Sequence, residues 1–232
     1  RLVADKEGQY VLKFTASDGE YSAECTLEIT LEKKGSVDYA LTAATSASYT
    51  AGWENVNGPN NPNFEPTTSS PGRGKGWGNW NAGAPAWFQY TWEKPVYINS
   101  CDIYWYDDNG GTRVPSNWSI QYSDDGVTWK NVQIDPSTPY SGATAKNRYN
   151  NLKFSPITTR YLRVYITSIT ANQPGTGILR WKVYGPVIDY IPDYHVMTPV
   201  GVIPQLPEEV PVTFDTGATM LFPVEWNAVT EA

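Results

Sequence analysis

The sequence predicts an all-β protein, and three observations support this fold class. Gly (19) and Pro (18) are spread along the 232 residues, as in proteins with many short strands joined by turns. No window shows a sustained apolar period of 3.6 residues, so little helix is expected. Residues 101–132 combine two alternating strands, a polar loop and an Asp-Asp-Gly turn into a third strand. This length can hold one large all-β domain or a module with flanking segments.

The first 34 residues predict a β-hairpin. Two runs alternate between apolar and polar residues, with Tyr10, Leu12, Phe14 and Ala16 in the first and Cys25, Leu27, Ile29 and Leu31 in the second. The turn between them, Ser17-Asp-Gly-Glu20, is typical of a hairpin. Two strands alone cannot bury a core, so their apolar face needs cover from another segment. Residues 32–36 are expected to be a short polar linker.

Residues 37–185 predict the main sheets. Strands are expected at 43–49, 87–92, 96–106, 118–122, 128–132, 152–154, 161–167 and 178–184. Within 161–166, Leu162, Val164 and Ile166 share one face, which places that face in a core. The long segment 50–85 is rich in Gly, Pro and Asn, yet it carries Trp53, Trp77 and Trp80. Three tryptophans argue against disorder, so a functional loop is expected.

Residues 186–232 change character. Prolines punctuate short β-like pieces here, which predicts a linker followed by further strands. The chain opens in the middle of a pattern at Arg1-Leu-Val-Ala-Asp5, without a signal-peptide pattern, so we expect a segment of a longer secreted protein.

Charge and cysteine content exclude some partners. The net charge is −7 with only 17 basic residues, which argues against nucleic acid or an anionic membrane as partner, although solubility alone can explain the acidity. No apolar run reaches transmembrane length, so no membrane insertion is expected. Cys25 and Cys101 fall in different predicted modules, and both are predicted to be buried free thiols.

Four motifs in the central segment resemble a known family. They are Cys101-Asp-Ile-Tyr-Trp-Tyr-Asp-Asp108, Arg113-Val-Pro-Ser-Asn-Trp118, Ser123-Asp-Asp-Gly-Val-Thr-Trp129 and Thr159-Arg-Tyr-Leu-Arg163. Together they resemble the discoidin, or coagulation-factor F5/8 type C, domain, and most of all the family 32 carbohydrate-binding modules of large secreted bacterial glycoside hydrolases. The resemblance implies a discoidin-like β-sandwich (jelly-roll) over residues 36–186.

Both flanks resemble parts of bacterial immunoglobulin-like domains. Residues 8–19 are similar to the last two strands of such a domain, and residues 198–210 with 224–226 to its opening strands. The expected organisation is therefore an immunoglobulin-like end at 1–35, the module at 36–186, and a linker with opening strands at 187–232.

Catalytic signatures are nearly absent. The single histidine, His195, lies far from any nucleophile pattern, and Gly72-Arg-Gly-Lys-Gly76 lacks the strand-then-helix setting of a phosphate loop. Glycosidase carboxylates must face each other across a cleft, whereas neighbouring residues on a strand, as in Asp107-Asp108, point to opposite faces. Asp124-Asp125-Gly126 is interpreted as a hairpin turn. We therefore predict no catalytic residue and no cofactor.

The candidate ligand site lies on loops. Asp107, Asp108 and Arg113 flank a short loop, and they could either close that loop or bind sugar hydroxyls. The resemblance implies an aromatic platform with polar neighbours at one end of the sandwich. The predicted ligand-binding residues are Trp53, Trp77, Trp80, Asp107, Asp108, Arg113, Tyr140, Asn147 and Tyr149.

No metal site is predicted. Many relatives carry calcium near the sandwich rim, held by an Asp-Gly turn in the first loop and a Glu near the last strand. Here the matching positions are Asn57-Gly58 and Arg180, and a guanidinium cannot ligate a cation. Arg180 is instead expected to donate to carbonyls of the first loop or to Glu54.

The expected function is carbohydrate binding without catalysis. Trp and Tyr, with ten and sixteen copies, combine a flat apolar face with a hydrogen-bonding edge, which matches the character of sugars. The expected partners are a glycan or polysaccharide and the catalytic domain of the parent protein, outside the cell, on its surface or in the periplasm of a bacterium. The alternative is a structural spacer without a ligand. An exposed aromatic cluster favours binding, and buried Trp77 and Trp80 favour the spacer.

Overall fold

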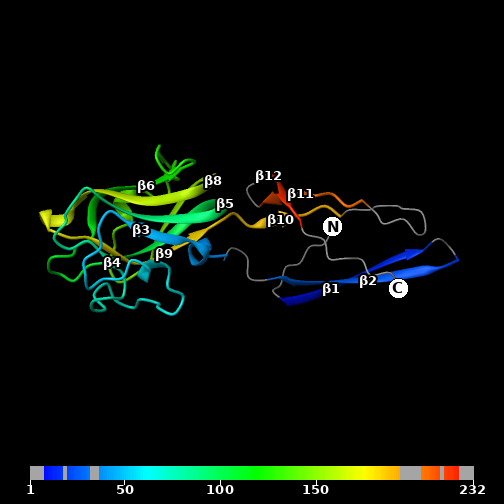
Figure 1. The fold of residues 1–232 in the computed structure, drawn as a ribbon, viewed down its shortest axis with the longest axis horizontal. Coiled ribbons are helices and arrows are strands. Elements are labelled where there is room, and N and C mark those ends of the chain that lie inside the picture. Colours follow the sequence, from blue (N-terminus) through cyan, green and yellow to red (C-terminus); the bar gives the residue numbers. More distant parts are fainter. Residues whose placement is uncertain (1–7, 18–19, 32–36, 194–204, 215–216, 225–232) are drawn as a thin grey trace. The chain divides into compact units, whose positions relative to one another are not determined.

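The computed structural model describes residues 8–17, 20–31, 37–193, 205–214 and 217–224 (Figure 1). The Asp18-Gly19 turn, the linker 32–36, His195 and Trp226 lie outside the described residues. The chain divides into two units, Val37–Pro186 and a second one made of Arg1–Ser36 with Val187–Ala232. Among the described residues, no helix has the length and apolar character needed to span a bilayer.

The flanking unit contains two separate small sheets. β1 (Gly8–Ser17) and β2 (Ser22–Leu31) form an antiparallel hairpin in which Leu12 is opposite Leu27, and this confirms the predicted hairpin. β10 (Ile188–Tyr190), β11 (Glu209–Phe214) and β12 (Thr219–Pro223) form a three-stranded antiparallel sheet. Phe214 and Phe222 pack edge to face in this sheet, with ring centroids 5.8 Å apart.

The Val37–Pro186 unit is built on seven antiparallel strands (Figure 1). Their order is β4-β9-β5-β8-β6-β7, with β3 also paired to β5. The strands are β3 (Ala44–Ala47), β4 (Trp77–Gly78), β5 (Ala86–Tyr106), β6 (Pro115–Ser123), β7 (Lys130–Asn131), β8 (Asn150–Ile169) and β9 (Gly177–Tyr184). Short 3₁₀ turns accompany them: η1 (Tyr39–Thr42), η2 (Gly58–Asn60), η3 (Tyr140–Gly142) and η4 (Thr170–Asn172).

Two long strands, β5 and β8, run through both layers of the sandwich. The first part of β5 pairs with β3 and with residues 161–166 of β8, and its second part pairs with β9 and with residues 150–159 of β8. A register shift separates Thr91 from Val96, and such irregularities let a strand bend. The sequence analysis predicted separate strands at 87–92 and 96–106, and at 152–154 and 161–167. That prediction was wrong, because each pair forms one continuous, bent strand.

Aromatic rings fill the core between the layers. The ring of Tyr90 stacks on Trp181 at 4.7 Å between centroids, and Trp105 meets Trp118 edge to face at 4.9 Å. Leu162, Val164 and Ile166 are fully buried, which confirms the predicted inward face of that strand. The Cys101 thiol is also buried and free.

The first and last segments of the unit are joined to each other. Asp38 forms an antiparallel bridge with Tyr184 and caps η1 by accepting the N–H of Ala40 at 3.1 Å. Its carboxylate also accepts the N–H of Val183, in β9, at 3.0 Å. The start of the unit is therefore held against its last strand.

Candidate functional site

The loop between β3 and β5 separates its tryptophans into a core residue and two surface residues. Trp77 lies in β4, which pairs with β9, and its ring is fully buried against Phe88 at 5.5 Å between centroids. Its Nε1 donates to the carbonyl oxygen of Tyr49 at 2.9 Å. The ring has no face open to a ligand, so the prediction that Trp77 binds a ligand was wrong.

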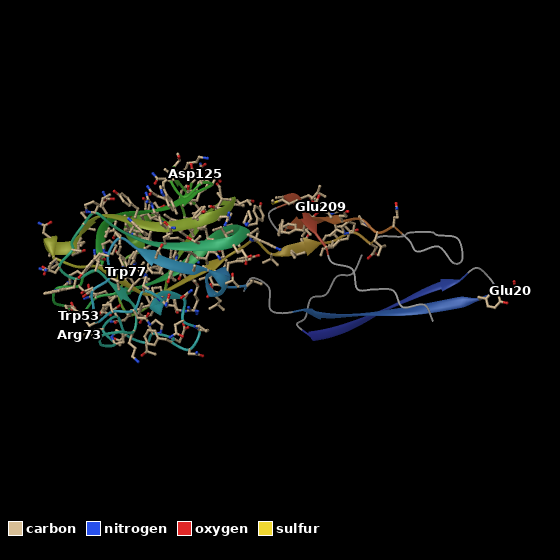
Figure 2. The ribbon with its side chains drawn as sticks, viewed as in Figure 1. Glu20, Trp53, Arg73, Trp77, Asp125 and Glu209 are labelled. Atoms are coloured by element: carbon tan, nitrogen blue, oxygen red, sulfur yellow. The ribbon has the colours of Figure 1, made fainter. Side chains whose placement is uncertain are left out.

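Trp53 and Trp80 form an exposed aromatic pair. Their side chains are 42% and 38% exposed, and their ring centroids lie 5.4 Å apart with planes tilted by 50°. The Arg73 guanidinium carbon lies 4.8 Å from the Trp53 ring centroid, a cation–π contact. We call Trp53, Arg73 and Trp80 the tryptophan cluster. Figure 2 shows Trp53 and Arg73 at the same edge of the unit, on the side remote from the Asp125 turn.

Glycines set the position of Trp80. A Cβ atom on Gly111 would lie 2.3 Å from Nε1 of Trp80, and one on Gly175 would lie 2.7 Å from its Cα. Only glycine permits such close approach at both positions. The preceding residue, Asn79, donates to the carbonyl of Gly83 at 2.7 Å and accepts the N–H of Thr176 at 2.7 Å. The backbone that carries the ring is therefore fixed by the Asn79 side chain and by close contact with two glycines.

Asp107 holds the loop beside Trp80 and does not face a ligand. Its side chain has no exposed surface, and it accepts the N–H groups of Asn109 at 3.0 Å and Val114 at 3.3 Å. Nε of Arg113 lies 3.2 Å from its Oδ2, and Nζ of Lys146 lies 3.6 Å from its Oδ1. Of the two interpretations of the Asp–Arg pair, the contacts of the buried Asp107 side chain fit loop closure, while Arg113 is 27% exposed and remains a predicted ligand contact.

Asp108 remains at the surface of the same loop. One of its oxygens, Oδ1, accepts the N–H groups of Gly110 at 2.8 Å and Thr112 at 3.0 Å. The residue is exposed, so it can still offer a carboxylate oxygen to solvent or a ligand.

Tyr140, Asn147 and Tyr149 each fulfil a structural role. The Tyr140 hydroxyl accepts the N–H of Ile120 at 3.0 Å, and its ring packs on Trp118. Asn147 accepts the N–H of Ser69 at 2.8 Å and donates its own N–H to the Ser69 hydroxyl.

The Tyr149 hydroxyl donates to Glu65, and Lys182 lies 4.6 Å from the centroid of its ring. None of these contacts joins the tryptophan cluster. The sequence prediction grouped these three residues with it because their loops were expected to reach the same end of the sandwich.

Two charged residues, Arg73 within the tryptophan cluster and Glu54 beside it, were not among the predicted ligand-binding residues. The Glu54 carboxylate accepts the N–H of Gly74 at 3.0 Å, which ties the Arg73 turn to the residue after Trp53. Burial raises the pKa of Glu54, and the nearby Asp108 acts in the same direction, while the Gly74 N–H, Tyr106 and Arg73 oppose it. Burial, with Glu54 and Asp108, raises the pKa of the Tyr106 hydroxyl to about 12. The cluster therefore has a mixed-charge rim of Arg73, Glu54 and Asp108.

The signal for Arg73 was present in the sequence. In Gly72-Arg-Gly-Lys-Gly76, which lacks the setting of a phosphate loop, Arg73 has a glycine on each side. Gly72 and Gly74 both have positive φ, +93° and +74°, which L side chains rarely adopt. The turn formed by these two glycines thus allows the Arg73 guanidinium to lie over the Trp53 ring.

The predicted contact of Arg180 is confirmed. Its Nη1 donates to the carbonyl oxygen of Pro59, in the first loop, at 3.1 Å, and its Nη2 donates to Oδ2 of Asp38 at 3.2 Å. The alternative partner, Glu54, is engaged by Gly74. In the described part of the chain, no three His, Cys, Asp or Glu side chains are grouped so that they could hold a metal ion.

Comparison with known families gives two matches along the chain. The F5/8 type C domain matches residues 40–182, and the bacterial Ig-like domain (group 4) matches residues 191–232.

Solved structures with a similar fold include three bacterial proteins. Chitosan-binding module 1 from the chitosanase/glucanase of Paenibacillus sp. IK-5 is 20% identical, with 63% of this chain and 97% of that chain covered and a TM-score of 0.47. The Streptococcus pneumoniae beta-galactosidase BgaA is 18% identical, with 61% and 90% covered and a TM-score of 0.49. CBM32-3 from a family 31 glycoside hydrolase of Clostridium perfringens is 17% identical, with 64% and 94% covered and a TM-score of 0.46.

Proposed function

The chain belongs to the F5/8 type C domain family, and on this premise we propose that residues 36–186 are a non-catalytic carbohydrate-binding module of a secreted multidomain glycoside hydrolase. The observation that carries the proposal is the tryptophan cluster. Two indole rings stand exposed and in contact with each other on loops, whereas Trp77, Trp92, Trp105, Trp118 and Trp181 of the same unit are buried.

The chemistry of the cluster suits a sugar. The C–H faces of a pyranose ring can stack on an indole, and the sugar hydroxyls need donors and acceptors at the rim of that stack. Arg73 supplies donors on the face of Trp53, and Asp108 supplies an exposed acceptor in the loop whose Gly111 lies against Trp80. Hydrogen bonds to ionised groups are about twice as strong as neutral ones, so a small number of them can orient one sugar.

Exposure of the aromatics separates binding from the spacer alternative. Trp77 is buried, as a spacer requires, but Trp80 is 38% exposed and pairs with Trp53. A spacer has no use for two neighbouring exposed indoles, because their hydration is unfavourable. The cluster therefore favours binding over a purely structural role.

The context of the module belongs to the same proposal. We assign residues 1–35 to the end of an immunoglobulin-like domain and residues 187–232 to a linker and the opening strands of another. The partners proposed are a glycan or polysaccharide and the catalytic domain of the parent protein. The proposed location is extracellular, on the cell surface or in the periplasm of a bacterium.

The test is a glycan-array screen of the full chain, followed by calorimetry on the best ligand with Trp53→Ala and Trp80→Ala. Each variant should lose about 1 kcal/mol of stacking beyond the lost apolar area, or roughly fivefold or more in Kd. Melting temperatures should stay unchanged. Tyr190→Ala is the matched control, since Tyr190 is an aromatic of similar exposure, 39%, in the other unit.

Two outcomes would contradict the proposal. The first is that no glycan on the array is retained. The second is that Trp80→Ala lowers the melting temperature while affinity stays intact, which would make the ring a structural residue.

A further inference from the structure

A buried cation lies where three distant segments of the Val37–Pro186 unit meet. Arg180 is 3% exposed and belongs to β9, the last strand of the unit. Its guanidinium reaches Asp38, at the start of the unit, and Pro59, in the first loop. Residues 38, 59 and 180 are thus joined through one positively charged group.

The acceptors around this group are oxygen atoms of the kind that hard cations prefer. Oδ2 of Asp38 is a carboxylate oxygen and the Pro59 acceptor is a backbone carbonyl, at 3.2 and 3.1 Å from the two terminal nitrogens of Arg180. A second donor completes the junction, because Nδ2 of Asn60 bonds the carbonyl oxygens of Ala40 and Ala43 at 3.2 and 2.9 Å. The side-chain nitrogens of Arg180 and Asn60 therefore already donate to these carbonyl and carboxylate oxygens.

The residues present do not fit a calcium ion. Calcium takes six to eight oxygen ligands, and its affinity follows the number of carboxylates. Arg180 has five N–H donors and no acceptor, so it brings positive charge and no ligand. Asn57 is turned away, since its Oδ1 accepts the hydroxyl of Thr45 at 2.5 Å. Within the described part of the chain, the carboxylate that pairs with Arg180 is that of Asp38.

We propose that the Arg180 guanidinium is a built-in cation that takes the structural place of a divalent metal ion, so that this module folds and works without calcium. Like a metal, it gathers a carboxylate and a backbone carbonyl from separate segments around one positive charge. Unlike a metal, it is covalently part of β9 and cannot be removed by a chelator. The inference does not depend on what the tryptophan cluster binds.

The first test needs only the wild-type chain. Thermal melts in millimolar CaCl₂ and in excess EDTA should coincide, and calorimetric titration with CaCl₂ should give no binding heat. A rise of several degrees with calcium would overturn the proposal. Because this test uses the wild-type chain, its outcome does not depend on whether a variant folds.

The second test removes the cation. Arg180→Met leaves the Asp38 carboxylate, only 11% exposed, without its cationic partner. The melting temperature should therefore fall by about 6–20 °C, and calcium should not restore it. Arg148→Met is the matched control, because Arg148 is an exposed arginine, and its melting temperature should not change. Equal melting temperatures of the two variants would show that Arg180 holds nothing together.

The third test distinguishes a metal substitute from an ordinary buried arginine. The double variant Asn57→Asp/Arg180→Glu supplies two carboxylates in place of an amide and a guanidinium, which changes the local formal charge from +1 to −2. Its melting temperature should rise by several degrees in CaCl₂ relative to EDTA, and by less in MgCl₂, which demands a stricter geometry. The same melting temperature in both salts and in EDTA would refute the replacement of a metal.

Discussion

The Asp107 carboxylate should be the most sensitive polar group in the loop beside Trp80. The perturbation is Asp107→Asn, which keeps the shape of the side chain but removes its charge and one acceptor. In the wild type this fully buried group serves two backbone N–H donors, from Asn109 and Val114, and faces the cations of Arg113 and Lys146.

The expected cost follows from these contacts. Breaking a buried ion pair by removing one partner costs about 3–5 kcal/mol when the remaining charge is fully buried. Here the Arg113 and Lys146 side chains are 27% and 38% exposed, so water can solvate part of their charge. A buried donor left unsatisfied adds about 1–3 kcal/mol. With the loss of the ion pair discounted to about 1 kcal/mol for this exposure, the two losses together should lower the free energy of unfolding of Asp107→Asn by about 2–4 kcal/mol.

The assay is urea unfolding followed by fluorescence, in which the midpoint should fall while the slope stays constant. The matched control is Asp108→Asn, the same chemical change on the exposed neighbour, whose amide oxygen can still accept from Gly110 and Thr112. This control should cost less than about 1 kcal/mol. If the two variants lose equal stability, the carboxylate of Asp107 does not hold the loop and the reasoning fails.

Four further predictions follow from other parts of the unit. The N–H groups of Thr128 and Val127 lower the pKa of Asp125 below its unfolded value. Its contribution to stability is therefore present above about pH 4 and is lost on acidification, so Asp125→Asn should flatten the acid limb of a plot of melting temperature against pH. Burial raises the pKa of Cys101 to about 12, so peptide mapping should find this thiol unmodified by iodoacetamide at pH 8 until urea is added. Gly111→Ala should displace Trp80 and weaken glycan binding about as much as Trp80→Ala, and unchanged affinity would show that the ring is not held by this contact. Residues 36–186 expressed alone should show the slow amide exchange of the full chain, whereas a peptide of residues 1–34 should exchange freely; equal protection of both would contradict this division.

Much of the fold was predictable because its signal is local. The alternation in 161–166 and the Asp-Asp-Gly turn depend on neighbouring residues only, and both are present in the structure, where Gly126 has a φ of +76°. The continuity of β5 and β8 was not predictable in this way. It depends on which half of each strand meets which partner, and that choice is made by tertiary pairing across the two layers.

The candidate site was less predictable, because its residues are of the same types as core residues and differ only in whether the side chain points into the core or toward solvent. Trp77 and Trp80 are three positions apart in the same loop, yet the first is bonded inside the sandwich and the second is exposed. Asp107 and Asp108 are adjacent and likewise face opposite environments. Arg73 escaped notice because its role depends on the φ angles of two glycines, which the sequence suggests but does not specify.

The bridge between Asp38 and Tyr184 has a mechanical consequence. The chain enters the Val37–Pro186 unit at one side of this antiparallel bridge and leaves it at the other. Tension along the chain therefore acts first on this bridge and on the bonds that the Asp38 side chain makes to Val183 and Arg180. While this contact holds, the force does not pass through the loops that carry Trp53 and Trp80, because both loops lie between Asp38 and Tyr184 in the sequence. Force applied at the two ends of the unit therefore leaves the exposed tryptophans unstrained for as long as those ends remain bonded to each other.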